Sequence, residues 1–218
     1  MPEINLMDFY PNLDRDVDWR AKNITLEQRK AASKFGKEFF DEDRLYGYGG
    51  YKYDGRWVKI VEKFRDHYKL DASSSVLDVG CAKGFMLHDL MKLIPGIKVA
   101  GIDISEYAID NAMEDVKPFI QVANARSLPF PDKSFDLVVS ITTVHALPLE
   151  ECKQAIREIQ RVSKKHAFIT IDAWRNDLEK ERLFKWVVVL GGTIMHVDDW
   201  KKLFKEVGYT GDYYWFFA

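Results

Sequence analysis

Ser75-Val-Leu-Asp-Val-Gly-Cys-Ala-Lys-Gly84 is the stretch that decides the fold. Its first half is a run of aliphatic residues, which is typical of a strand buried on both faces. Its second half is a turn of small residues, and helical apolar spacing follows from Phe85 to Ile94. Gly80 and Gly84 permit backbone conformations and close ligand approach that a Cβ would obstruct, and the amides at the start of the helix can bind an anion. The stretch therefore predicts a strand, a turn and a helix that together hold a nucleotide-like ligand.

A second apolar strand, Lys98 to Ile102, ends at Asp103. This acidic residue stands about 20 residues past the glycine turn, a spacing at which a carboxylate can accept both hydroxyls of a ribose. The sequence thus indicates a nucleoside in the ligand.

Three segments together resemble the successive motifs of class I S-adenosylmethionine-dependent methyltransferases, and in particular the type 11 methyltransferases. They are Asp78-Val-Gly-Cys-Ala-Lys-Gly84, Gly101-Ile-Asp103-Ile-Ser105 and Asn124-Ala-Arg-Ser-Leu-Pro-Phe-Pro-Asp-Lys-Ser-Phe-Asp-Leu-Val-Val-Ser140. The resemblance extends from Val76 to Asp172. It implies an α/β fold, with a Rossmann-like, doubly wound, mostly parallel sheet covered by helices on both faces, and S-adenosyl-L-methionine as the cofactor. The residues that it assigns to the cofactor are Asp78, Gly80, Cys81, Ala82, Gly84, Asp103, Ile104, Asn124, Ala125 and Ser140.

Two of these positions depart from the usual pattern of the family. Ala82 stands at the middle glycine of the turn, and Asn124 replaces the acidic residue usually found near the adenine amino group. Alanine adds only one methyl group, and an amide oxygen can still accept a hydrogen bond. A non-catalytic protein that binds the cofactor is therefore an alternative to an enzyme.

The composition is that of an ordinary soluble globular protein, with 218 residues of which 47% are hydrophobic and 30% charged. A net charge of −2 gives no basic field that would attract nucleic acid. The two cysteines, Cys81 and Cys152, argue against a disulfide framework. No apolar run is long enough for a membrane span, and the N-terminus lacks a signal-peptide pattern. We expect a cytoplasmic protein without nucleic-acid or membrane partners, and a homodimer is left open.

Residues 1–70 are expected to form an N-terminal helical extension with an aromatic lid, and residues 71–218 the S-adenosylmethionine-binding domain, packed as one compact unit. Met1 to Asn23 is expected to be an extended segment. Thr25 and Gln28 have the spacing of a capping box, so a helix is predicted from Thr25 to Phe40.

The aromatic stretch Tyr46-Gly-Tyr-Gly-Gly-Tyr-Lys-Tyr-Asp-Gly-Arg-Trp57 has four tyrosines and four glycines in twelve residues. Ring faces attract a cation such as a sulfonium, and a guanidinium matches the geometry of a carboxylate. Two interpretations are open. The stretch is either an aromatic loop packed on the sheet, or a lid in which Tyr48, Tyr51 and Arg56 approach the cofactor or the substrate.

Strands and helices alternate through the rest of the chain. We expect helices at Trp57–Tyr68, Ser105–Val116, Leu149–Val162 and Asp198–Val207, and strands at Phe119–Ala123, Phe135–Ile141, Ala167–Ile171 and Tyr213–Phe217. Trp186 to Leu190 is undecided between strand and helix. Members of the family usually end in an antiparallel hairpin, but only ten residues follow Gly208, so one strand of that hairpin is expected to be missing or displaced.

Methyl transfer from a sulfonium requires alignment with a nucleophile, and removal of a proton when the nucleophile is a hydroxyl or a protonated amine. The candidates for this base, or for contact with the substrate, are His145, Asp172 and His196. The alternative for His145 is a structural or solvent-facing histidine, and the alternative for Asp172 is a helix cap. His67, His88 and His166 are expected at the surface, and because the histidines are scattered, no metal site is predicted.

The predicted function is transfer of a methyl group to an oxygen or nitrogen of a polar small molecule, such as a sugar or a natural-product-like compound. Ser140-Ile-Thr-Thr143 stands where family members that methylate bases or glutamine carry an Asn-Pro-Pro-Tyr motif, which disfavours those substrates. A nicotinamide-dependent oxidoreductase is a further alternative, and the proline-rich loop before Phe135 fits it poorly.

Overall fold

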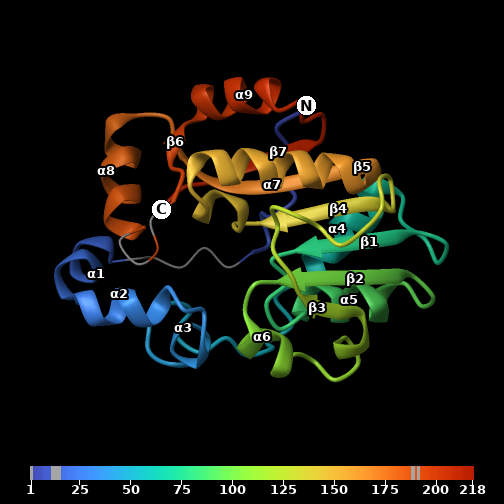
Figure 1. The fold of residues 1–218 in the computed structure, drawn as a ribbon, viewed down its shortest axis with the longest axis horizontal. Coiled ribbons are helices and arrows are strands. Elements are labelled where there is room, and N and C mark those ends of the chain that lie inside the picture. Colours follow the sequence, from blue (N-terminus) through green and yellow to red (C-terminus); the bar gives the residue numbers. More distant parts are fainter. Residues whose placement is uncertain (1, 11–15, 188–189, 191) are drawn as a thin grey trace.

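A parallel sheet forms the centre of the computed structural model, which describes residues 2–10, 16–187, 190 and 192–218 (Figure 1). Its strands are β1 (Ser75–Val79), β2 (Lys98–Asp103), β3 (Ile120–Val122), β4 (Phe135–Ile141), β5 (Ser163–Trp174), β6 (Met195–His196) and β7 (Asp212–Phe216). The order is β3-β2-β1-β4-β5-β6, and β7 also pairs with β5. Each of these strand pairs is parallel. The predicted doubly wound, mostly parallel sheet is confirmed.

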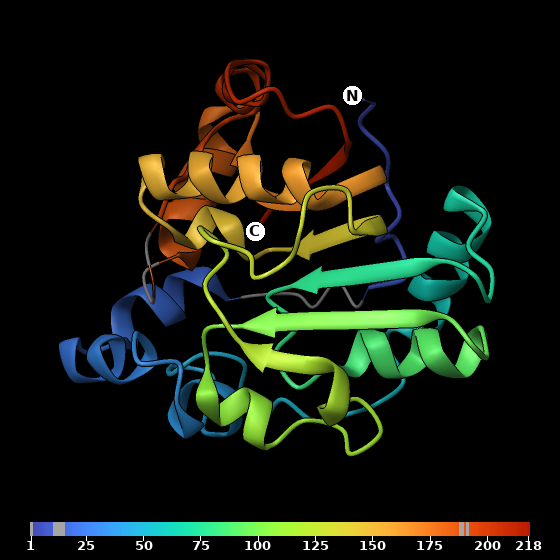
Figure 2. The ribbon, with the colours of Figure 1, turned by 45° about the vertical axis from the view of Figure 1, so that its right-hand side comes forward.

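Helices cover both faces of this sheet, and Figure 2 shows the two layers from a second side. The helices that pack on one face with Val76 are α4 (Val58–Tyr68), α5 (Phe85–Leu93) and α6 (Glu106–Asp110). The helices that pack on the other face with Leu77 are α7 (Leu149–Val162) and α9 (Val197–Glu206). Successive strand residues point to opposite faces, so Val76 and Leu77 belong to two separate apolar cores.

The chain reverses its direction of winding between β1 and β4, the two central strands. β1 pairs with β2 on one side and with β4 on the other, and each partner is reached through a crossover. In open parallel sheets, ligands bind beyond the carboxyl ends of the strands at such a switch point. The topology therefore predicts a site at the ends of β1, β2 and β4.

The end of the sheet confirms that the terminal antiparallel hairpin is incomplete. β6 has two residues, and β7 lies parallel to β5 with Phe168 opposite Asp212. The outer edge of β7 is covered by the N-terminal segment, because Glu3 forms a bridge with Tyr213 and the Ile4 amide donates to the Tyr213 carbonyl (3.0 Å). An edge paired in this way cannot recruit another strand.

The N-terminal extension contains more helix than the sequence predicted. α1 (Val17–Asn23), which Asp16 caps, lies within a segment expected to be extended, so that expectation is wrong. The capping box of Thr25 and Gln28 is confirmed. The predicted single helix to Phe40 is instead two helices, α2 (Leu26–Ala32) and α3 (Lys37–Asp41). They are separated at Phe35, whose φ of 50° is left-handed and cannot continue a helix.

Two further helices differ from the expectation. α6 ends at Asp110 and does not reach Val116, because the Met113 amide turns back to donate to the Lys83 carbonyl (3.1 Å). α8 (Asp177–Trp186), capped by Asn176, was not predicted. In the stretch Trp186 to Leu190, which the sequence left undecided between strand and helix, Trp186 ends this helix. Residues 188–189 lie outside the described part of the chain.

Asp136 joins the starts of three strands. Its Oδ2 accepts hydrogen bonds from the amide and the hydroxyl of Ser75 (2.9 and 3.0 Å), and its Oδ1 lies 3.0 Å from the Lys165 ammonium. Burial alone would raise the pKa of Asp136, but the bonds from Lys165 and Ser75 outweigh burial and lower it to about 2. The carboxylate of Asp136 thus stabilises the fold when it is ionised.

Asp136→Asn is predicted to destabilise the protein by about 2 kcal/mol at neutral pH. The folded pKa lies below the ordinary value of 3.8, so this stability is present above pH 3.8 and is lost as the pH falls toward 2. Urea unfolding of the variant and the unsubstituted protein across this range measures the difference. Asp110→Asn, at an exposed position of α6, is the control. An equal difference at pH 7 and pH 2.5 would contradict the assignment.

Candidate active site

The turn after β1 fits only a glycine at its first position. Gly80 has a φ of +89°, and a Cβ on it would lie 2.2 Å from Oγ1 of Thr143. The amides of Gly80 and Cys81 both donate to the Ile102 carbonyl at the end of β2 (2.8 and 3.0 Å). Thus β2 sets the path of the turn, and the turn brings its backbone to the switch point of the sheet.

Ala82 also adopts a left-handed conformation, with a φ of 48°. A residue with a Cβ is disfavoured there by about 1–2 kcal/mol, which explains why the family pattern has glycine at this position. The Ala82 amide donates to Oδ2 of Asp103 (2.8 Å), and this bond to a buried carboxylate opposes the strain. The alanine therefore keeps the backbone path that the family's glycine would take.

Asp103 stands at the end of β2 with both carboxylate oxygens engaged by the backbone. Its Oδ2 accepts from Ala82, and its Oδ1 accepts from the Ser105 amide (2.9 Å). Burial raises the pKa of Asp103, although these backbone bonds oppose the rise. Each carboxylate oxygen has a second acceptor site, so the group can still bind the two hydroxyls of a ribose. The position fits the cofactor's sugar.

Asp78, in the middle of β1, is buried beside this turn. Burial, and after it the negative charge of Asp103, raise the pKa of Asp78 to about 8. At neutral pH the group is therefore mainly a carboxylic acid and can donate a hydrogen bond. A cationic group bound next to it would favour the ionised form again.

The other residues assigned to the cofactor divide into two groups. Ile104 is 51% exposed directly after Asp103 and offers an apolar surface to a flat base, and Gly84 begins α5 in a left-handed conformation. Asn124 is already in use, because its side-chain oxygen accepts from the amide and the Nε of Arg126 (3.0 and 3.1 Å). Ser140 is completely buried and its hydroxyl donates to the Val79 carbonyl (3.1 Å), so it offers the cofactor no polar group.

Two small residues complete this set. Cys81 is buried within the turn, and burial raises the pKa of its thiol. The thiol therefore stays protonated and contributes packing. Ala125, which follows Asn124, is half-buried and packs against the apolar core beneath α7.

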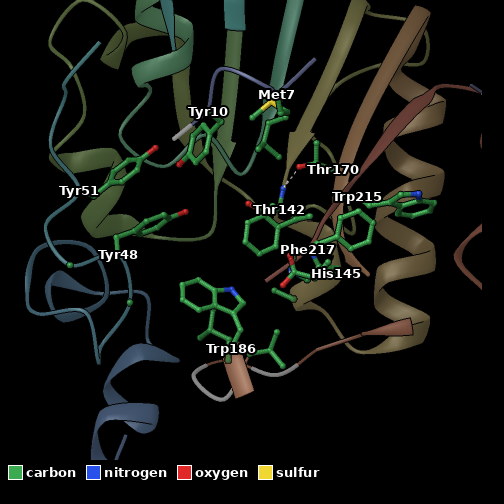
Figure 3. Close-up of a pocket in the computed structure, with 18 of the residues that line it drawn as sticks. Met7, Tyr10, Tyr48, Tyr51, Thr142, His145, Thr170, Trp186, Trp215 and Phe217 are labelled. Carbon is green, nitrogen blue, oxygen red and sulfur yellow. Dashed lines mark hydrogen bonds and ion pairs between the residues drawn. The ribbon is translucent and has the colours of Figure 1, made fainter. Parts of the chain in front are cut away.

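A cavity of about 710 Å³ opens beside the carboxyl ends of β4 and β5 (Figure 3). Polar residues of these strand ends line one side of it. Aromatic residues from five separate parts of the chain line the rest: the N-terminal segment, α3, the aromatic stretch, the end of α8 and the C-terminal residues. The rings are those of Tyr10, Phe39, Tyr48, Tyr51, Trp186, Tyr214, Trp215, Phe216 and Phe217.

His145 and Asp172 meet in this cavity. His145 lies in the short 3₁₀ helix η2 (Val144–Ala146) after β4, and Asp172 lies near the end of β5. Nε2 of His145 is 3.4 Å from Oδ2 of Asp172, and both side chains are buried. Nδ1 of His145 is buried and has no hydrogen-bond partner among the described residues. The sequence named both residues but did not pair them.

The loop that carries His145 is fixed to β5. The Thr142 amide donates to both the carbonyl and the hydroxyl oxygen of Thr170 (2.9 and 3.0 Å). Thr142 has a φ of 48°, which is rare for a β-branched residue and indicates a conformation imposed by its surroundings. The position of His145 relative to Asp172 is therefore rigidly determined.

His196 lies outside the cavity lining and has a structural role. It caps α9, where its Nδ1 accepts from the Asp198 amide (3.2 Å), and its Nε2 is 3.2 Å from the Arg175 carbonyl. The cap that His196 forms was not expected from the sequence, which named this residue only as a candidate base or substrate contact. His88, expected at the surface, is instead buried on α5 with its Nδ1 2.7 Å from Asp115, so that expectation is wrong.

The aromatic stretch folds over the glycine turn. The ring of Tyr51 stacks on Phe85, the first residue of α5 (4.8 Å between centroids), and Tyr48 contacts Tyr51 (4.4 Å). The Tyr48 side chain is 36% exposed, but desolvation of its hydroxyl, then the nearby Tyr10, and then Asp103 and Asp78 raise its pKa, so the hydroxyl stays protonated. Arg56 lines the cavity but is held in a bidentate pair with Asp54 (2.9 and 2.6 Å).

Lys83, a residue that the sequence did not single out, fastens this stretch to the turn. Its buried ammonium donates to both carboxylate oxygens of Asp41 at the end of α3 (2.6 and 2.9 Å) and to the Tyr51 carbonyl (3.3 Å). Tyr107 donates to the same carboxylate (2.6 Å). The position of Lys83 between Ala82 and Gly84 was the sequence signal for this role, because the left-handed backbone at both neighbours fixes the direction of the lysine side chain.

Among the residues that the structure describes, no cluster of three or more His, Cys, Asp or Glu side chains is arranged to hold a metal ion. None of their helices is long and apolar enough to cross a membrane.

Comparisons with known proteins agree with the geometry. Residues 77–171 match the Methyltransf_11 family, a methyltransferase domain. The chain is 36% identical over 89 residues to the mitochondrial arginine-hydroxylase NDUFAF5 of Rattus norvegicus, which covers 40% of this chain and 25% of that protein. It is 32% identical over 131 residues to the demethylmenaquinone methyltransferase of Symbiobacterium thermophilum, covering 55% and 50% of the two chains. The chain thus spans half or less of the length of these two relatives.

The fold is also similar to that of solved structures. The YcgJ protein of Bacillus subtilis superposes with a TM-score of 0.56 and 20% identity over 67% of this chain and 66% of that one. With the sheet order, the glycine turn and the matched sequence in agreement, residues 77–171 of this chain form a methyltransferase domain of the class I family, which binds S-adenosylmethionine.

Proposed function

We propose that the protein is an enzyme that transfers a methyl group from S-adenosylmethionine to an oxygen or nitrogen of a polar small molecule. The observation that carries the proposal is the buried pair of His145 and Asp172 in the cavity at the carboxyl ends of β4 and β5. A protein that only binds the cofactor would have no use for a histidine and a carboxylate paired at the wall of a second cavity. The family assignment also argues against a nicotinamide-dependent oxidoreductase.

The residues at the switch point fit the cofactor. Gly80 and Gly84 permit the left-handed path of the turn, where a Cβ would clash with Thr143 or Val116. Asp103 offers acceptor sites that suit a ribose, and Ile104 presents an apolar face. When bound, the cofactor supplies an electrophilic methyl group on a sulfonium. The task left to the protein is to orient the acceptor and to take its proton.

His145 is the group best placed to take that proton. Asp172 lies against its Nε2, which orients the ring and stabilises the positive charge that the imidazole gains. Nδ1 has no partner among the described residues but is itself buried, so an acceptor that bonds to it must displace the atoms that cover it. His145 would accept the proton of the acceptor hydroxyl or ammonium, which leaves the acceptor atom a lone pair to take the methyl group while S-adenosylhomocysteine departs.

The form of the cavity favours a small acceptor over a macromolecule. Its volume of about 710 Å³ lies within the range of about 300–1,000 Å³ that is typical of small-molecule sites. The chain has a net charge of −2, which offers no general attraction for nucleic acid. Aromatic walls with a few polar groups at the strand ends suit a compound with both flat and polar surfaces.

The aromatic stretch acts as the lid of this site in our proposal. It reaches the cavity through Tyr48 and Tyr51 and is tied to the cofactor turn through Lys83. Glycines make such a stretch costly to order, because each fixed residue loses about 1–2 kcal/mol of backbone entropy. Contacts with cofactor and substrate would offset this cost.

Asp103→Ala is predicted to weaken binding of S-adenosylmethionine ten- to a hundredfold. The loss follows from removing a charge-assisted contact worth about 1.5–3 kcal/mol. Calorimetry measures the affinity, and circular dichroism checks that the fold survives the loss of the bonds to Ala82 and Ser105. Asp110→Ala removes a carboxylate from an exposed position of α6 and serves as the control. Unchanged affinity in a folded Asp103 variant would refute the placement of the ribose.

His145→Ala is predicted to lower kcat by roughly 10²- to 10⁴-fold while the affinity for the cofactor stays the same. Asp172→Asn should lower kcat less, because it leaves the base in place. The loss in the alanine variant should shrink at high pH, where the acceptor ionises without help. His166→Ala, at an exposed position of β5, is the matched control. Full activity of the His145 variant would contradict the role of a base and show that methyl transfer depends only on the alignment of the acceptor with the methyl group.

Lys83→Met is predicted to release the lid. Amides of residues 45–56 should exchange hydrogen faster in this variant, and binding of S-adenosylhomocysteine should slow their exchange less than in the unsubstituted protein. Lys59→Met, which removes an exposed lysine of α4, controls for the loss of charge. Equal exchange in both proteins, with and without the ligand, would show that the stretch is permanently packed.

A further inference from the structure

One wall of the cavity carries two guanidinium groups over a single indole ring. The guanidinium carbon of Arg20 is 4.7 Å from the centroid of the Trp186 ring, and that of Arg44 is 5.7 Å from it. All three residues line the cavity, and Arg20 is only 6% exposed. Arg20 also donates to the Arg44 carbonyl, and Arg44 donates to the Tyr48 carbonyl. This wall, which we call the Arg20–Arg44–Trp186 wall, is therefore connected to the lid.

The charges around the cavity leave Arg44 without a counter-charge. Asp8 pairs with Lys63 and Arg56 with Asp54, while Asp172 lies beside His145 at the strand ends. Arg44 has no acidic partner among the described residues. An anion bound at this wall would supply the missing counter-charge.

The other side of the same space is aromatic. The rings of Tyr10 and Tyr48 lie across the cavity from Phe217, and Trp186 lies below them in the view of Figure 3. A flat ring gains contact area and favourable ring geometry in such surroundings. An anion held by arginine gains the further geometric match of the planar guanidinium with a carboxylate.

We propose that the acceptor substrate is an aromatic compound that carries a carboxylate, and that Arg44 binds this carboxylate. The proposal rests on the proposed function, because the hydroxyl or amino group to be methylated is placed at His145. The Arg20–Arg44–Trp186 wall then determines specificity, since a neutral compound of the same shape leaves Arg44 without a counter-charge. The carboxylate of the cofactor's methionine part is the other carboxylate that Arg44 could bind, and the experiment distinguishes it from the carboxylate of the acceptor.

Calorimetry with two probes tests the proposal. The probes are 4-hydroxybenzoate and its neutral analogue 4-hydroxybenzamide, each titrated into protein saturated with S-adenosylhomocysteine. We expect the acid to bind at least tenfold more tightly than the amide. Arg44→Met should reduce the affinity for the acid to that for the amide and leave the amide unaffected, whereas Arg44→Lys should retain part of the preference. Arg29→Met, on the exposed side of α2, should change neither affinity.

Three outcomes would overturn the proposal. Equal affinity of the acid and the amide would show that the wall does not select an anion, and absence of binding by both would show that it does not accept such rings. If Arg44→Met weakened S-adenosylhomocysteine but not the acid, Arg44 would belong to the cofactor's carboxylate. These three outcomes are measured by binding alone and do not require methyl transfer. If the acid bound selectively but no acceptor were methylated, the proposed binding of a carboxylate would stand and the proposed methyl transfer would be refuted. Failure of the one proposal is thus distinguishable from failure of the other.

Discussion

The hydrogen bond from the Ala82 amide to the Asp103 carboxylate, beside those from Gly80 and Cys81 to the Ile102 carbonyl, joins the two strand ends on which the site depends. Three of the five residues from Gly80 to Gly84 have left-handed conformations, and such a backbone does not stay in place by its own preference. The carboxylate and the Ile102 carbonyl hold it from the side of β2. The fixed path of the turn determines where α5 begins and the direction in which the Lys83 side chain points.

Lys83 carries the constraint from the sheet to the N-terminal extension. Its ammonium is buried against Asp41, and burying an ion pair is favourable only when the geometry is good and the remaining donors are satisfied. The Tyr51 carbonyl and the Tyr107 hydroxyl satisfy these conditions. The extension is therefore held at the cofactor turn by a polar contact of fixed geometry, in addition to apolar packing. This explains why residues so distant in sequence form one cavity.

The sequence was sufficient for the features that local chemistry determines. The strand before Gly80, the turn and the position of Asp103 follow from residue type and spacing, and the capping box at Thr25 is likewise local. The division between α2 and α3 and the presence of α8 were not predictable, because they depend on contacts with other parts of the chain. The pairing of His145 with Asp172 lies between these cases. Both residues follow neighbouring strands, but the register of β4 and β5 that brings them together exists only in the folded sheet.

The bridge between Glu3 and Tyr213 brings together residues that are about 210 positions apart. Contacts of such high sequence separation form late in folding, because the entropy of closing a long loop must be overcome first. Tyr10 and Trp215 lie a few residues beyond the two paired segments, on the wall of the cavity. The central strands can thus assemble early, while the cavity acquires its shape only when the two distant segments meet. In this protein the scaffold and the cavity it supports belong to different stages of folding.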